Sequence, residues 1–204
     1  MKRRIVVATA NSDKLAEIRS ILEGLGVELV PIREIVDDWH VEETGGTLRE
    51  NALIKARAAR DATGLPAVGD DTGLSVDALG GAPGIYAARY AGSDCSYSDN
   101  VRKLLRALAG EAGPGRRAAF VTAAALVMPD GREACVHGEV RGHITDSPQG
   151  EGGFGYDPVF YSLELGKTFA ESAPEEKNRI SHRRRALEAL RQELRRMEMA
   201  ATGS

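Results

Sequence analysis

The first 31 residues constrain the fold of this chain more than any other stretch. A short β-branched run at 5–8 leads into a polar turn, a helical pattern starts at Asp13, and a second apolar run follows at 28–31. The apolar positions of the helical pattern are Leu15, Ile18, Ile21, Leu22 and Leu25, and Gly24 and Gly26 are expected to end it. Two strands separated by a helix pair in parallel, so the opening predicts an α/β fold.

The remaining pattern continues this alternation of strands and helices. Thr47 and Glu50 have the spacing of a capping box, and the helix that they open is expected to end at Gly64. We predict strands at 65–68, 74–76, 118–128, 133–140 and 159–161, and helices at 47–62, 100–109 and after Ser181. The acidic segment 35–46 is expected to be a loop, and the glycine-rich connector near 110–116 is the expected boundary between two lobes.

Composition excludes several classes of protein. The chain has 204 residues with 42% hydrophobic and 28% charged residues, which is the mix of an ordinary globular domain. A net charge of −3 argues against a generally basic nucleic-acid binder. Cys95 and Cys135 lack metal-ligand spacing, so we expect free thiols in a reducing compartment. The basic and apolar start is too short for a signal peptide, and we expect a cytoplasmic protein that does not enter a membrane.

The segment Gly69–Gly73 carries the most unusual chemistry. Asp70 and Asp71 are adjacent and flanked by glycines, between two apolar runs that we predict to be separate strands. Two neighbouring carboxylates are unfavourable unless a cation or a shared proton relieves the repulsion. The pair therefore indicates a functional acidic site where a strand breaks, and the local alternative is a solvated turn.

Two further turns are candidates for ligand binding. The turn 9–14 joins a strand to a helix N-terminus, where free N–H groups favour an anion; the local alternative is a capped helix. Residues 150–155 match GxGxxG, but a strand rather than a helix follows, so we reject a dinucleotide site. Glycines beside Phe154 and Tyr156 instead suit a loop that a flat ring can approach, or a plain hairpin.

The arginines near the C-terminus allow two interpretations. Nucleic acid could bind to Arg183, Arg184, Arg185, Arg191, Arg195 and Arg196. Glutamates interleave with these arginines, however, which is typical of a solvated helix face. His182 and Arg183 differ, because they lie beside a predicted helix N-terminus, where they could reach a ligand.

Taken together, these motifs resemble the inosine triphosphate pyrophosphatase family over nearly the whole chain. The motifs are TxNxxK at 9–14, EETG at 42–45, ENALIKA at 50–56, DDTGL at 70–74, GAPGIY at 81–86, GGFGYDP at 152–158 and EKNRISHR at 176–183. The resemblance implies a single domain over 1–204 with two lobes, a long mixed β-sheet with flanking helices and a central active-site cleft. It also implies a homodimer that uses Mg²⁺ and hydrolyses non-canonical purine nucleoside triphosphates (ITP, dITP, XTP, dXTP) to the monophosphate and pyrophosphate.

The resemblance also implies roles for individual residues. The catalytic residues carried over by motif are Asp71 as general base, Asp70, Lys14 and Lys55. The implied metal ligands are Asp71 and Glu43, with Glu42 a weaker candidate, and Asp70 fits the same acidic site in a supporting metal or structural role. The implied substrate-binding residues are Thr9, Ala10, Asn11, Ser12, Asp13, Lys14 and Thr72 towards the phosphates, and Phe154, Gly155, Tyr156, Asp157, Lys177, His182 and Arg183 towards the base.

Two alternative functions remain at the level of sequence. Within the enzymes, a Maf-like pyrophosphatase would act on modified pyrimidine triphosphates. Outside them, a non-enzymatic nucleotide or RNA-binding protein would use the arginines at the C-terminus. The preferred hypothesis requires a purine triphosphate as partner and neither nucleic acid nor a membrane.

Overall fold

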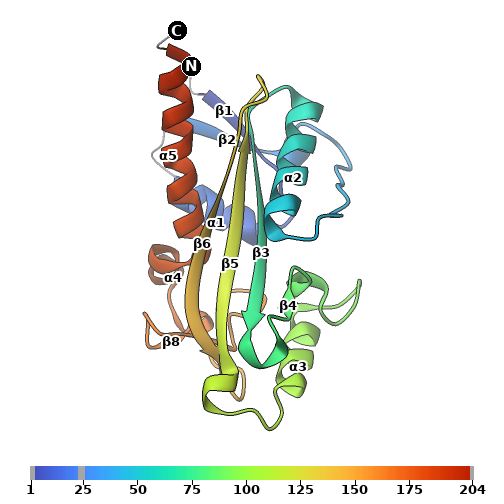
Figure 1. Ribbon diagram of the computed structural model, residues 1–204, viewed down its shortest axis with the longest axis vertical. Coiled ribbons are helices and arrows are strands. Elements are labelled where there is room, and N and C mark those ends of the chain that lie inside the picture. The colour runs from blue at the N-terminus through green and yellow to red at the C-terminus, as the bar shows by residue number, and fades with distance from the viewer. Residues whose placement is uncertain (1–2, 23–25, 203–204) are drawn as a thin grey trace. The chain divides into compact units, whose positions relative to one another are not determined.

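The computed structural model describes residues 3–22 and 26–202, and Figure 1 shows its elements. The helices are α1 (Ser12–Leu22), α2 (Leu48–Thr63), α3 (Tyr97–Ala107), α4 (Pro174–Ile180) and α5 (His182–Thr202). The strands are β1 (Arg3–Val7), β2 (Val27–Pro31), β3 (Ala67–Val76), β4 (Pro83–Gly84), β5 (Arg117–Val127), β6 (Glu133–Ile144), β7 (Phe160–Ser162) and β8 (Lys167–Thr168). The predicted helix end at 24–25 lies outside the described residues.

The fold is a mixed α/β fold with an open sheet, as predicted. Within the described residues the sheet has eight strands in the order β2-β1-β3-β5-β6-β7-β8, with β4 paired to β3. Strand β1 pairs in parallel with β2 and β3, which confirms the prediction from the first 31 residues. The pairs β3–β4, β6–β7 and β7–β8 are antiparallel. None of the helices in the described ranges combines the length and apolar composition needed to cross a bilayer.

The chain divides into two compact units. Unit 1 comprises residues 1–71, 122–138 and 183–204, and unit 2 comprises residues 72–121 and 139–182. Each of β3, β5 and β6 contributes residues to both units. Residues 110–116, the expected lobe boundary, lie inside unit 2.

Unit 1 has helices on both faces of its strands. Because side chains alternate along a strand, neighbouring residues of β1 pack against different helices. Ile5 and Val7 of β1 pack in one cluster with residues of α1 and α5. Val6 packs in another cluster with Ala59 of α2. The same alternation continues in β5, where Leu126 belongs to the first face and Val127 to the α2 face. Both faces of these strands are therefore covered, which explains why their sequences are continuously apolar.

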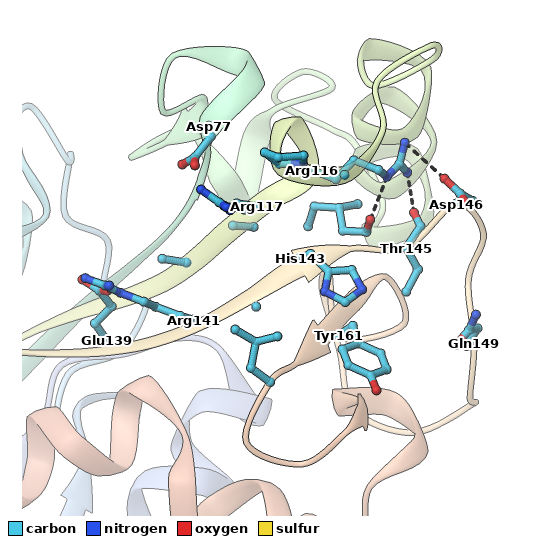
Figure 2. Close-up of a pocket in the computed structure, with 17 residues that line it drawn as sticks. Asp77, Arg116, Arg117, Glu139, Arg141, His143, Thr145, Asp146, Gln149 and Tyr161 are labelled. Carbon is cyan, nitrogen blue, oxygen red and sulfur yellow. Dashed lines mark hydrogen bonds and ion pairs between the residues drawn. The ribbon is translucent and has the colours of Figure 1, made fainter.

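Unit 2 covers one face of its strands and leaves the other open. Leu74, Phe120 and Phe160 share a core with the apolar stripe of α3. On the other face, Arg117, Glu139 and other residues of β5, β6 and β7 line an open hollow of about 1140 Å³ (Figure 2). Arg116 at its rim donates to the carbonyls of Ile144 and Thr145 at 2.8 and 2.6 Å, so this arginine ties the ends of two strands together. The alternating polar pattern of β6 reflects this one-sided burial.

Two local predictions need correction, and one helix was not predicted. The predicted break at 69–73 is wrong, because β3 runs without interruption from Ala67 to Val76. The capping box of α2 is half formed: Thr47 accepts from the N–H of Glu50, but Glu50 accepts from the N–H of Gly46. Helix α4 was not predicted, because at seven residues it is too short to show a periodic pattern.

Candidate functional site

Strand β3 separates the two adjacent carboxylates. Because successive side chains of a strand point to opposite faces, Asp70 shares a face with Val68, and Asp71 shares a face with Ala67. Val68 packs with α1 and α5, whereas Ala67 packs with α2. Asp70 accordingly contacts Lys14 of α1 and Asp71 contacts residues of α2. The alternation of the strand, rather than a turn, keeps the two negative charges apart.

Helix α2 approaches β3 closely because small residues line the contact. A Cβ added at Gly69 would lie 2.4 Å from the carbonyl oxygen of Ala52 and 2.8 Å from the nitrogen of Ala56, so only glycine fits there. This close approach places Asn51 and Lys55, which are four residues apart and share a helix face, against Asp71.

Both oxygens of Asp71 have a protein donor. Lys55 Nζ lies 3.3 Å from Oδ1, and Asn51 Nδ2 donates to Oδ2 at 3.1 Å. Lys55 also binds the carboxylate of Glu43 at 3.2 Å. Burial raises the pKa of Asp71 and the charge of Glu43 adds to this rise, while the lysines oppose it; the net pKa lies above the ordinary value. A buried carboxylate with a raised pKa is suited to accept a proton.

Asp70 has the opposite electrostatic environment. Its side chain is 1% exposed, and its Oδ2 lies 3.2 Å from Lys14 Nζ and 3.3 Å from Arg183 Nε. Arg183 is also 1% exposed and pairs with Glu17 of α1. Burial alone would raise the pKa of Asp70, but the positive charges of Lys14 and Arg183 outweigh burial, and the pKa lies far below its ordinary value. Burial lowers the pKa of Lys14 below its ordinary value, although the negative charge of Asp70 acts in the opposite direction.

The turn at 9–14 is capped by its own side chains. Asn11 Oδ1 accepts from the N–H groups of Asp13 and Lys14 at 2.9 and 3.0 Å, and Thr9 Oγ1 accepts from the N–H of Asn11 at 3.2 Å. This confirms the capped-helix alternative for the local structure. Ala10 and Ser12 are exposed in the same turn. Phosphate contacts here would therefore depend on side chains, Lys14 above all, more than on the backbone N–H groups expected from the sequence.

The acidic residues could supply part of the coordination shell of a cation, with the remaining positions taken by substrate oxygens and water. Asp70 Oδ1 is buried and has no hydrogen-bond partner among the described residues, and Glu43 and Asp71 share the ammonium of Lys55. Glu42 is exposed. The described part of the chain holds no cluster of three or more His, Cys, Asp or Glu residues able to bind a metal ion alone. Mg²⁺ commonly takes one or two carboxylates and completes its shell with phosphate oxygens and water, so this donor set suits it.

Unit 2 contains a second group of predicted site residues. Lys177 Nζ lies 2.6 Å from Asp157 Oδ2 and 4.6 Å from the centre of the Phe154 ring, which is partly exposed. Asp157 Oδ2 also accepts from the N–H of Phe154 at 2.9 Å. A Cβ at Gly153, whose φ is +70°, would lie 2.2 Å from the same oxygen. The glycines of this loop thus let a buried carboxylate hold the backbone that presents Phe154. Gly155 and Thr72 are partly exposed in the same unit.

Two of the predicted base-binding residues lie in the core of unit 2. Tyr156 is 4% exposed and its hydroxyl donates to the carbonyl of Ala87 at 2.9 Å. Burial raises the pKa of Tyr156 far above its ordinary value, so the hydroxyl stays protonated. His182 is 3% exposed and stacks on Phe120 with ring centres 4.7 Å apart. Arg183, its neighbour in sequence, belongs to unit 1 through its contacts with Asp70 and Glu17.

We expect Asp157→Asn to destabilise the protein by about 3 kcal/mol, because it removes the negative charge beside a buried ammonium. Asp157 is 2% exposed and Lys177 is 5% exposed, so solvent screens this pair little. Urea denaturation measures the loss. The control is Glu176→Gln, which alters a surface pair with Lys167 and should cost less than about 1 kcal/mol. Equal midpoints for the two variants would contradict the expectation.

Sequence reasoning missed two polar residues of the unit 1 group. Glu17 lies one helical turn after Lys14, and Asn51 lies one turn before Lys55. Both therefore share a helix face with a predicted catalytic lysine, and this spacing was the available signal. The open hollow of unit 2 is a separate feature, because its lining residues include none of the predicted catalytic residues (Figure 2).

Comparisons with known proteins show the family to which the chain belongs. The model of the Ham1 family matches residues 5–193. A dITP/XTP pyrophosphatase of Geobacter sulfurreducens is 50% identical over 191 residues, which cover 94% of this chain and 96% of the relative. A dITP/XTP pyrophosphatase of Geobacillus kaustophilus is 48% identical and covers 92% of each chain. The structure of a HAM1 protein from Coxiella burnetii has a TM-score of 0.86 at 42% identity, covering 95% of this chain and 99% of that one. The chain belongs to the Ham1 family.

Proposed function

We propose that this protein hydrolyses the non-canonical purine nucleoside triphosphates ITP, dITP, XTP and dXTP to the monophosphate and pyrophosphate. The observation that carries the proposal is the arrangement of the two carboxylates of β3: Asp71 lies between Lys55 and Asn51, and Asp70 lies between Lys14 and Arg183. The dITP/XTP pyrophosphatases that resemble this chain over more than 90% of its length support the substrate class.

In the proposed reaction, water attacks the α-phosphorus in line with the leaving pyrophosphate. Asp71 accepts a proton from the water, a new phosphorus–oxygen bond forms, and the bond to the β-phosphate oxygen breaks. Lys14 and Lys55 neutralise the charge of the triphosphate. Burial lowers the pKa of Lys14, and the negative charge of a bound phosphate would oppose this shift and favour the charged ammonium.

Mg²⁺ is part of the proposal as the cofactor. Asp71 and Glu43 would hold it, with Glu42 as a weaker candidate, and the substrate phosphates would complete the shell. The chemistry that Mg²⁺ supplies when bound is neutralisation of phosphate charge and a more acidic water. We further propose a homodimer and a cytoplasmic location, where nucleoside triphosphates are made and used.

The residues of unit 2 are assigned to the base. Phe154 offers a partly exposed ring, on which any purine could stack. Selection would come from donors such as Lys177 that face the carbonyl at position 6 of inosine and xanthosine. Adenine presents an amino group there, which leaves such a donor unpaired, at a cost of roughly 1–3 kcal/mol for each contact. Several contacts of this kind are needed to reject ATP strongly.

The test is a comparison of kcat/KM for ITP, dITP, XTP, GTP, ATP and UTP, with added inorganic pyrophosphatase to convert the product to phosphate. We expect ITP and XTP to exceed ATP by at least about 100-fold, and a chelator to abolish turnover. Faster turnover of UTP than of ITP or XTP would favour the Maf-like alternative. Nucleotide or RNA binding without turnover of any triphosphate would overturn the enzyme proposal.

A further inference from the structure

We propose that Asn51 is a positioning residue of the reaction: its side-chain amide fixes the orientation of the Asp71 carboxylate, and the N–H of Gly45 fixes the orientation of the amide. The inference rests on the proposed function, in which Asp71 accepts the proton of the attacking water.

The contacts of Asn51 select one orientation of its amide. The side chain is 0% exposed, its Nδ2 donates to Asp71 Oδ2 at 3.1 Å, and its Oδ1 accepts from Gly45 N at 2.8 Å. An amide has one end that donates and one that accepts. If the group were flipped, Nδ2 would face the N–H of Gly45, and Oδ1 would face a carboxylate oxygen. Because both flipped contacts are repulsive, the N–H of Gly45 keeps the donor end towards Asp71.

The Nδ2 group of Asn51 is the second donor that holds the Asp71 carboxylate in place. Lys55 holds Oδ1 and Asn51 holds Oδ2, so each oxygen of the carboxylate is tied to a different residue of α2. The terminal torsion of an aspartate is otherwise broad, and a single donor would leave it free to swing. Each carboxylate oxygen keeps a lone pair with which it can accept from water. The carboxylate of the proposed base is therefore held in one orientation relative to an incoming water.

Gly45 must lie close to Asn51 for this contact, and its neighbour offers a matched comparison. A Cβ at Gly45 would lie 2.6 Å from Asn51 Oδ1 and 2.6 Å from Glu50 Cβ, which is too close for any side chain. A Cβ at Gly46 would lie 3.6 Å from Glu50 Oε2, an ordinary contact. Alanine at these two adjacent positions thus separates an effect on the Asn51 amide from a general effect on the loop.

The first experiment measures kcat and KM for ITP in Asn51→Leu and Asn51→Asp. Asn51→Leu removes both hydrogen bonds at similar volume, and Asn51→Asp keeps an acceptor for Gly45 but turns an oxygen towards Asp71. We expect kcat to fall by roughly 100-fold in each variant, the scale of a misplaced reacting group. KM should stay within about threefold, because the residues assigned to substrate binding are unchanged.

The second experiment compares Gly45→Ala with Gly46→Ala. We expect kcat to fall by about tenfold or more in the first, and to stay within about twofold of the wild type in the second. Rates are divided by the number of sites that bind a non-hydrolysable ITP analogue, so that loss of folded protein is not mistaken for loss of positioning. If Asn51→Leu and Asn51→Asp do not fold, this glycine pair decides the question.

The outcomes distinguish this inference from the proposed function. A wild-type protein that turns over no triphosphate refutes the proposed function itself. An active wild type, with folded Asn51→Leu and Gly45→Ala variants that keep kcat within threefold, refutes the positioning role alone. A raised KM at unchanged kcat would also overturn it, because Asn51 would then act in substrate binding.

Discussion

Asp71→Asn should lower kcat by about 100- to 10,000-fold while leaving nucleotide binding measurable, because an amide cannot take up the proton of the attacking water. The replacement has nearly the same shape, and Asp71 lies beside Asn51 and Lys55, which remain in place. The measurement is phosphate release from ITP together with the affinity for a non-hydrolysable analogue. Asp61→Asn is the control, because Asp61 is 66% exposed on the same helix as Lys55.

The pH dependence of the wild type follows from the same carboxylate. Burial raises the pKa of Asp71, and only its deprotonated form can act as a base. We therefore expect kcat to fall as the pH drops through the pKa that the Asp71 carboxylate has when Mg²⁺ and substrate are bound, because the charge of Mg²⁺ opposes the effect of burial. Asp61→Asn should retain this acid limb. A near-normal rate for Asp71→Asn would refute its assignment as the base.

The fold class was predictable because the strands of unit 1 are buried on both faces. Ile5–Val7 reads as a buried strand, and the apolar spacing of α1 identifies its helix directly. The break predicted at 69–73 shows the limit of this reasoning. Asp70, Asp71 and Gly73 are poor strand formers by propensity, yet β3 continues through them because helices supply cations on both of its faces.

The grouping of site residues was predictable only in part. Residues that the motifs single out do lie together in the structure: Lys14 contacts Asp70, and Lys55 contacts both Asp71 and Glu43. The roles of Asn51 and Glu17 depend on which residues share a helix face with a lysine, and on Gly69 being small enough to admit α2. The order of residues in the sequence does not show how closely α2 approaches β3. The burial of Tyr156 and His182 likewise depends on core packing that the glycine-rich motif does not reveal.

Asp70→Asn should destabilise the protein by about 3–5 kcal/mol, because it removes the countercharge of two buried or half-buried cations. Asp70 and Arg183 are each 1% exposed, so the pair is hardly screened by solvent. Glu17 would still pair with Arg183, but Lys14 would lose its partner at 3.2 Å. Urea denaturation at neutral pH measures the loss, and Asp61→Asn should stay within about 1 kcal/mol of the wild type.

The effect of Asp70→Asn should itself depend on pH. A carboxylate whose pKa is depressed in the folded state contributes stability above its unfolded pKa, and this contribution is lost as the pH falls towards the folded pKa. The pKa of Asp70 is depressed because Lys14 and Arg183 outweigh its burial. The difference in stability between wild type and variant should therefore be constant above about pH 5 and shrink below about pH 4. A difference that grows as the pH falls would show that Asp70 is stabilised in its protonated form, contrary to the ion pairs that surround it.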